Sequence, residues 1–104
     1  MTTLFIDTSS NVEVLVGLEI DGKKFVEKRE LDRKKAQIVL PMIDELLKTH
    51  HLTIEDLDAI EVAEGPGSFT GLRVGISIAN TLSHFLNIPI NGKKPGTVID
   101  PIYS

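Results

Sequence analysis

The chain has 104 residues, of which 41% are apolar, 25% charged and 5% aromatic. These values predict one small, soluble, folded domain and exclude a two-domain enzyme. The net charge of −4 disfavours a solitary nucleic-acid binder, because such a protein needs basic residues to neutralise phosphates. The lack of cysteine excludes disulfides, thiolate nucleophiles and Cys-based metal sites. Without a leader or an apolar run of about 18–20 residues, we expect a cytoplasmic protein that spans no membrane.

Three strands are predicted at the beginning of the chain. Leu4–Ile6 is a short apolar run that is closed by turn-forming residues at 7–11, which is typical of a buried strand. Apolar residues then alternate from Val12 to Ile20. Asp21-Gly22 favours a type I′ turn into a strand at Lys23–Leu31. The sequence therefore predicts an antiparallel hairpin after the first strand.

A helix is predicted to follow, with Asp32 as its N-cap and an end near His50 and His51. Its apolar residues recur at helical spacing. They are Ala36, Val39, Leu40, Ile43, Leu46 and Leu47. Pro41 interrupts this pattern, so it either bends the helix or marks its true start.

The second half of the chain has three more predicted elements and a tail. Thr53–Asp56 resembles a short capped turn, and Asp58–Ala63 a fourth strand. A glycine-rich loop then leads into a second helix of about sixteen residues, and Ile88–Ile90 is a possible fifth strand. The order βββαβα(β) predicts an α/β fold with a mixed sheet. We expect one lobe at 1–92 and a loose, polar, flexible tail at 93–104.

The loop Gly65–Gly71 contains three glycines, a proline and two hydroxyl residues directly before a helix. Free backbone amides at a helix N-terminus bind phosphate in many proteins. Together with the end of the first strand, the candidate phosphate-binding residues are Asp7, Thr8, Ser9, Gly67, Ser68 and Thr70. The alternative is purely structural: the glycines form a tight turn, a hydroxyl caps the helix and Asp7 forms a turn rather than binding a metal.

The second helix has more apolar surface than a sheet requires, since its apolar residues cover an arc of about 200°. Gly71, Gly75 and Ala79 form a row of small residues along it, which would let another helix approach closely. On the first helix, Ile38 and Met42 lie beside the main apolar stripe. Two such surfaces predict a helical interface, either between these two helices or with a partner.

The remaining polar residues suggest neither a catalytic nor a metal site. His50 and His51 are adjacent and cannot face one metal ion from a helix, and no Ser or Asp can be paired with His84 as in a catalytic triad. The basic residues between Lys28 and Lys35 are expected to form a solvated surface, with contact to RNA in an assembly as the alternative.

Four segments together resemble one known family. They are Leu4–Ser9, Val39–Leu47, Leu57–Ile60 and, above all, the string Gly-Pro-Gly-Ser-Phe-Thr-Gly-Leu-Arg-Val-Gly at 65–75. The resemblance is to the N-terminal lobe of the TsaB family and covers about residues 1–92. The related TsaD family has a similar loop and a paired-histidine metal motif that this sequence does not have.

The resemblance implies an actin-like (ASKHA, ribonuclease-H-like) single lobe in a bacterial protein that supports synthesis of threonylcarbamoyladenosine in tRNA. It implies a non-catalytic partner of a TsaD-like subunit, with a TsaE-like ATPase recruited by the complex and tRNA bound only indirectly. The implied contact residues are Ile38, Val39 and Met42 on the first helix and Arg73, Val74, Ile78 and Thr81 on the second. A homodimer through the same surface is expected for the isolated chain, and no cofactor is required by this chain, with ATP and magnesium possible only in the assembled complex.

Two departures from the family pattern stand out. Lys35-Ala36-Gln37 replaces the usual His-Ser-Glu segment, and family members continue into a second lobe of comparable size. The rival hypotheses are a nucleotide-binding or phosphate-binding lobe of an actin-like ATPase, and a glycoprotease-like peptidase.

Overall fold

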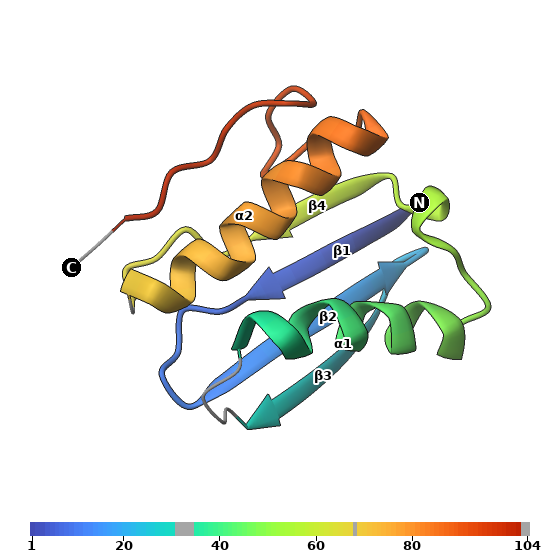
Figure 1. Cartoon of the computed structure of the whole chain (residues 1–104). Helices are drawn as coiled ribbons and strands as arrows, with labels where there is room; N and C mark the ends of the chain where they lie inside the picture. The colour runs from blue at the N-terminus through green and yellow to red at the C-terminus, as the bar shows by residue number, and fades with distance from the viewer. Residues whose placement is uncertain (31–34, 68, 103–104) are drawn as a thin grey trace.

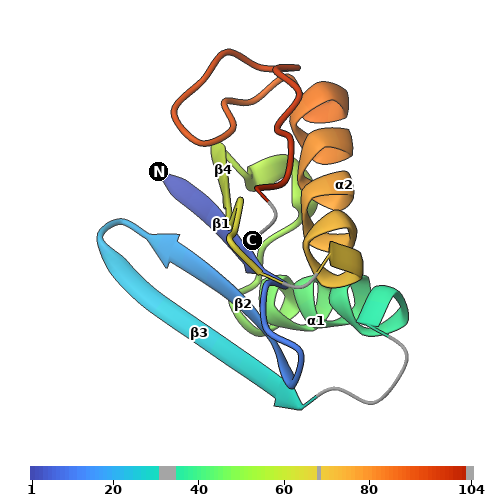
Figure 2. The ribbon, with the colours of Figure 1, turned by 90° about the vertical axis from the view of Figure 1, so that its left-hand side faces the viewer.

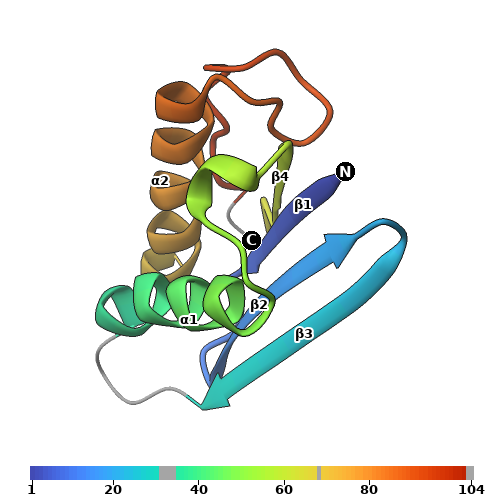
Figure 3. The same ribbon diagram turned by 90° about the vertical axis from the view of Figure 1, so that its right-hand side faces the viewer.

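The computed structural model describes residues 1–30, 35–67 and 69–102 of the chain. It contains one four-stranded sheet with the strand order β3-β2-β1-β4. Two helices, α1 and α2, lie on the same side of this sheet (Figures 1–3). The bounds of the elements are β1 Thr2–Asp7, β2 Glu13–Ile20, β3 Lys23–Glu30, α1 Lys35–Thr49, the 3₁₀ turn η1 Ile54–Asp56, β4 Ala59–Val62 and α2 Phe69–Leu86.

The first three strands form an antiparallel meander, as the alternating pattern predicted. Leu4 pairs with Leu18, and Leu18 in turn pairs with Phe25, so that their side chains share the helix-covered side. Asp21 and Gly22 both have positive φ angles, of 49° and 87°, which a type I′ turn requires. The predicted hairpin is confirmed, while Leu31 at its predicted end lies outside the described residues.

The α1 helix runs through Pro41 without starting there. A proline inside a helix removes one N–H and leaves the carbonyl four residues earlier without its usual partner. That carbonyl belongs to Gln37, and both Gln37 and Pro41 are exposed, so water can reach the carbonyl. The predicted N-cap Asp32 lies outside the described residues.

The segment after α1 brings the chain back beside β1. The amide of Thr53 donates to the Asp56 carboxylate at 2.8 Å, which confirms the predicted capped turn at η1. The following strand β4 pairs with β1 in parallel, with Leu4 opposite Ile60. The sheet is therefore mixed, as predicted.

The core lies between the sheet and the two helices. Its fully buried side chains include Leu4, Val16, Met42, Ile60 and Leu72. The prediction of an α/β fold with helices packed on a mixed sheet is confirmed. No helix in the described ranges is long and apolar enough to cross a membrane.

The C-terminal segment differs from the expected loose tail. Ile99 is only 2% exposed and belongs to the core, and the amide of Ile102 donates to the carbonyl of Glu64 at 2.7 Å. The possible fifth strand is reduced to single bridges from Ile90 to Ile60 and Lys93. The sequence did not reveal this packing because one buried isoleucine in a polar segment produces no periodic pattern.

Candidate functional site

Three of the predicted phosphate-binding residues, Asp7, Ser9 and Gly67, lie together where β1 ends beside the start of α2. A carboxylate oxygen of Asp7 accepts hydrogen bonds from the amide and the hydroxyl of Ser9, at 2.9 and 2.6 Å. Gly67 lies directly against Ser9, since a Cβ at Gly67 would stand 2.7 Å from the Ser9 carbonyl oxygen. The segment at 7–9 and Gly67, which are far apart in the chain, are therefore brought together. Asp7 forms the local turn that was the structural alternative.

Thr8 joins this turn to the first two turns of α2. Its side chain is 1% exposed, and its hydroxyl donates to the Gly71 carbonyl at 2.6 Å and accepts from the Gly75 amide at 3.0 Å. The hydroxyl thus acts both as a donor and as an acceptor of hydrogen bonds within the fold. Thr70 lies exposed, and Ser68 is outside the described residues.

Gly75, in the middle of the row of small residues on α2, faces the sheet and not another helix. A Cβ at Gly75 would stand 2.5 Å from the Thr8 hydroxyl oxygen and 3.2 Å from a methyl group of Ile6, and Ala79 is fully buried. The prediction that Gly71, Gly75 and Ala79 let a second helix approach is therefore wrong for Gly75, which lets α2 approach the end of β1. Helical spacing shows that the residues along one side of a helix are small, but it does not show which element packs against them.

Two of the contact residues assigned to α1 are part of the core. Val39 and Met42 are both 0% exposed, so they cannot form a surface for a partner, and the assignment is corrected at these positions. Ile38 is half-buried. It shares one side of α1 with Glu45, seven residues later, and Glu45 bonds to Arg29 of β3 at 3.1 Å.

The exposed apolar side chain of α1 is Leu40, with 52% exposure. Two residues from Ile38, it lies on the opposite side of the helix. It lines a groove of about 490 Å³ between α1 and η1, together with Ile43, Leu47, Leu52 and Ile54. The sequence placed Leu40 in the apolar stripe, but periodicity alone does not separate the edge of a stripe from its centre.

On α2, the predicted contact residues lie along its outer side. Arg73 and Thr81 are exposed, and Val74 and Ile78 are half-buried. Phe85, near the end of the helix, is 84% exposed. An exposed phenylalanine of this kind is a candidate anchor for a partner.

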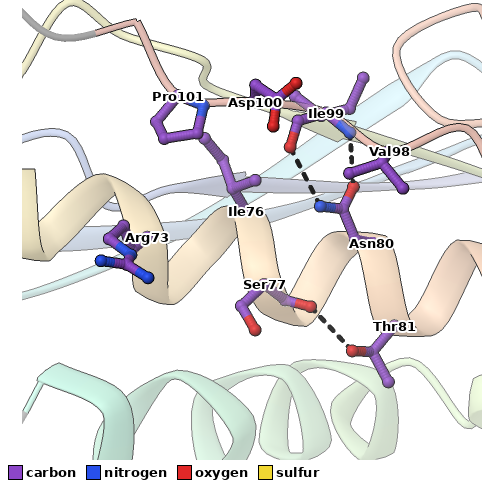
Figure 4. A pocket seen from close by; sticks show the side chains of 9 residues that line it. All are labelled: Arg73, Ile76, Ser77, Asn80, Thr81, Val98, Ile99, Asp100 and Pro101. Atoms are coloured by element: carbon purple, nitrogen blue, oxygen red, sulfur yellow. Dashed lines mark hydrogen bonds between the residues drawn. The ribbon is translucent and has the colours of Figure 1, made fainter.

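A second groove, of about 610 Å³, runs between α2 and the C-terminal segment (Figure 4). Arg73 and Thr81 line it, with Val98 and Pro101 across from them. The Asn80 side chain connects the two sides, because its amide donates to the Ile99 carbonyl at 3.1 Å and its oxygen accepts from the Ile99 amide at 2.9 Å. The sequence does not predict this role of Asn80, because a single polar residue on a helix does not indicate which distant residue it will bind.

Two charged residues that line the groove beside Leu40, Asp44 and Lys48, form an ion pair. Lys48 lies 2.9 Å from the carboxylate of Asp44, one turn earlier on α1, and this hydrogen bond raises the pKa of Lys48 above its ordinary value. Among the described residues, no group of three His, Cys, Asp or Glu side chains could hold a metal ion. We call the outer surface of α1 and α2 the helix surface and define it by the exposed or half-buried residues Leu40, Val74, Ile78, Thr81 and Phe85.

Comparisons with known proteins point to one family. A family model described as "TsaD: tRNA N6-adenosine threonylcarbamoyltransferase" matches residues 27–92. The tRNA threonylcarbamoyladenosine biosynthesis protein TsaB of Escherichia coli is 36% identical over 88% of this chain and 39% of its own length. The TsaB protein of Bacillus subtilis is 33% identical over 99% of this chain and 50% of its own length.

A solved structure supports the same relationship. YeaZ from Pseudomonas aeruginosa superimposes with a TM-score of 0.81 and 34% identity, over 86% of this chain and 41% of the YeaZ chain. The described fold is thus compatible with a single actin-like lobe, as the resemblance implied. The chain spans half or less of the length of each of these three proteins.

Proposed function

This chain belongs to the family described by the tRNA N6-adenosine threonylcarbamoyltransferase model, with TsaB proteins as its relatives. From that membership we propose that it acts in the biosynthesis of threonylcarbamoyladenosine in tRNA as a non-catalytic partner of a TsaD-like enzyme. The helix surface is the proposed contact. A TsaE-like ATPase and tRNA join through the assembled complex, in agreement with a net charge of −4 that is unfavourable for direct tRNA binding.

The observation that carries this proposal is the exposure of large apolar side chains on both helices. Leu40 and Phe85 are 52% and 84% exposed, although burial of such side chains is favourable by about 1.5–3 kcal/mol each. On α2, the partly buried side chains of Val74 and Ile78 add apolar surface and also pack against the core. A partner with a matching apolar surface would bury these groups.

A non-catalytic role agrees with the internal use of polar groups where β1 meets α2. The Thr8 hydroxyl and the Asp7 carboxylate form hydrogen bonds within the chain. These bonds stabilise the joint between strand and helix. The same groups would have to exchange their partners before they could hold a substrate.

The test is a binding titration between this chain and a TsaD-like protein from the same source. Leu40→Glu and Phe85→Glu place a charge in the proposed contact, and we expect each to raise the Kd by more than about tenfold. Because both side chains are exposed, the midpoint of thermal unfolding should stay nearly unchanged. Val74 and Ile78 are less suitable positions, since they also pack against the core.

Val12→Glu is the matched control, because Val12 is 69% exposed and lies in the loop before β2, outside the helix surface. It should bind like the unmodified chain. Normal binding by both helix variants would show that the contact lies elsewhere, and a complete lack of binding by the unmodified chain would refute the proposed partnership.

The nucleotide-binding alternative has one observation in its favour, the meeting of Asp7, Ser9 and Gly67 at the start of α2. Calorimetry of the isolated chain with ATP and magnesium tests it. We expect no heat of binding at micromolar concentrations. Saturable micromolar binding would support this alternative instead.

A further inference from the structure

The carboxamide of Asn91, in the turn that follows α2, pairs with the edge strand β4. Its Oδ1 atom accepts from the Val62 amide at 2.8 Å. Its Nδ2 atom donates to the Val62 carbonyl at 3.0 Å and to a carboxylate oxygen of Glu64 at 2.9 Å. The backbone amide of Asn91 donates to the carbonyl of Ile60 at 2.9 Å. One residue thus attaches the beginning of the C-terminal segment to the edge of the sheet.

The sequence makes this carboxamide more reactive than the other asparagine side chains. The backbone nitrogen of the next residue can attack the side-chain carbonyl of an asparagine, and a bulky side chain on that next residue hinders the attack. Asn91 is the only asparagine of the chain that precedes a glycine, Gly92. The other three precede β-branched residues, in the pairs Asn11-Val12, Asn80-Thr81 and Asn87-Ile88.

Gly92 is also open to the solvent. It is exposed, and a Cβ at this position would have no atom of the described residues within 4 Å apart from its chain neighbours. Its φ angle is 73° and that of Asn91 is 49°, as in a tight turn with asparagine and glycine at its centre. Water therefore reaches the nitrogen that would attack.

The reaction available to this pair is deamidation. The Gly92 nitrogen forms a bond to Cγ of Asn91, the bond from Cγ to Nδ2 breaks, and the proton of the Gly92 amide passes through water to Nδ2, which leaves as ammonia. Water then opens the five-membered imide at one of its two carbonyls, and the product is aspartate or isoaspartate. One water is consumed and one ammonia is released, with no oxidation or reduction.

The folded state opposes this reaction at the leaving group. The Nδ2 atom of Asn91 donates both of its N–H groups, one to Val62 and one to Glu64. Both hydrogen bonds are lost when Nδ2 leaves as ammonia. The docked side chain is therefore more stable than the reacting one, and the reaction is slowed for as long as the segment stays on β4.

The product does not fit the same place. An oxygen replaces Nδ2 and faces two acceptors, the carbonyl of Val62 and the carboxylate of Glu64. Acceptors that face each other form no hydrogen bond, and the two carboxylates repel. A chain that has reacted at Asn91 can no longer restore the pairing with β4.

We propose that Asn91 is a deamidation site controlled by the docking of the C-terminal segment. The docked segment protects the carboxamide, and an opening of the β4 edge exposes it to attack by Gly92. The resulting aspartate or isoaspartate keeps the edge open. Deamidation thus converts a reversible local opening into a permanent one.

Mass spectrometry of the full, unmodified chain tests the site and its protection. The chain is incubated at mildly alkaline pH in native buffer and in guanidinium chloride, and deamidation is read from the masses of its proteolytic peptides. We expect Asn91 to react at least about tenfold faster in the denaturant, because the docked edge must open first in native buffer. Equal rates in the two conditions would overturn the proposal.

The asparagines that precede β-branched residues are the internal controls of this experiment. They should react slowly in both conditions, because their following side chains hinder the attack even in the unfolded chain. A faster reaction at any of them than at Asn91 in the denaturant would also overturn the proposal.

Asn91→Asp imitates one product and tests its effect on the edge. We expect the Val62 amide to exchange its hydrogen at least about tenfold faster in this variant. Glu64→Gln is the matched control: alone it keeps an acceptor for Nδ2 and should change little. In the double variant its amide can donate to the new carboxylate, so most of the protection should return. Unchanged exchange in Asn91→Asp, or no recovery in the double variant, would contradict the proposed effect of the product.

Discussion

The hydroxyl of Thr8 connects the end of β1 to α2 through two short hydrogen bonds, to the carbonyl of Gly71 and from the amide of Gly75. A buried polar group is tolerated when its hydrogen bonds are formed. Removing it leaves its buried partners without hydrogen bonds, which lowers the stability of the fold. The Thr8 side chain therefore fixes the end of the strand against the helix. The absence of a side chain at Gly75 makes room for it.

Replacement of Thr8 by valine keeps the shape of the side chain but removes both hydrogen bonds. We expect Thr8→Val to lower the free energy of unfolding by about 1–3 kcal/mol, measured by urea denaturation. Thr8→Ser retains the hydroxyl and should lose less. Equal stability of the valine variant and the unmodified chain would show that the bonds contribute nothing.

Gly75→Ala tests the space opposite Thr8. Alanine gains up to about 1 kcal/mol from helix propensity, but its Cβ would stand 2.5 Å from the Thr8 hydroxyl oxygen, and such overpacking costs about 1–3 kcal/mol. We expect net destabilisation in the same denaturation experiment. Ser77→Ala, at an exposed position of α2, should be neutral or stabilising, and a stabilised Gly75→Ala variant would contradict the described contact.

At the level of elements, the C-terminal segment completes the edge of the sheet that β4 would otherwise expose. The side-chain amide of Asn91 accepts from the Val62 amide at 2.8 Å and donates to its carbonyl at 3.0 Å. It thus takes the place of a strand. An unpaired edge invites association with other chains, and here the described part of the edge is bonded within the molecule.

Ile99 and its neighbour Val98 provide a matched pair for testing this element. Ile99 is 2% exposed and Val98 is 69% exposed. We expect Ile99→Ala to lower the free energy of unfolding by about 2–5 kcal/mol and Val98→Ala to change it by less than about 0.5 kcal/mol. Similar effects of the two substitutions would mean that the segment is not docked.

At the scale of the whole molecule, the radius of gyration is 12.7 Å. A compact chain of this length is expected to have about 13 Å, so the described C-terminal segment does not extend away from the lobe. The amides of Ile99 and Ile102 both bond inside the fold, to Asn80 and to the Glu64 carbonyl. The segment and the lobe should therefore unfold together.

Native-state hydrogen exchange measures this directly. We expect the amide of Ile99 to be protected to a degree similar to that of Ile60 in β4, because both exchange through the same opening of the lobe. The amide of Gly92 in the preceding turn is a suitable fast-exchanging reference, since Gly92 is exposed. Rapid exchange at Ile99 would indicate a separately fraying segment.

The sequence by itself determined the elements, their order and the family. Alternating residues predicted the hairpin, helical spacing predicted α1, and the string from Gly65 to Gly75 identified the relatives, because each of these is a local pattern. The surface assignment was less successful: Val39 and Met42 are buried, whereas Leu40 and Phe85 are exposed. Spacing defines an apolar arc, but the depth of each residue depends on how the helix is turned against the sheet.

What only the tertiary structure decided are the contacts between residues that are far apart in the chain. Thr8 reaches Gly75 across 67 positions, and Asn80 reaches Ile99 across 19. The bare sheet face also emerges only from the strand pairing and from both helices lying on one side. Local patterns report the environment that a residue needs, and only the folded chain determines which neighbours supply it.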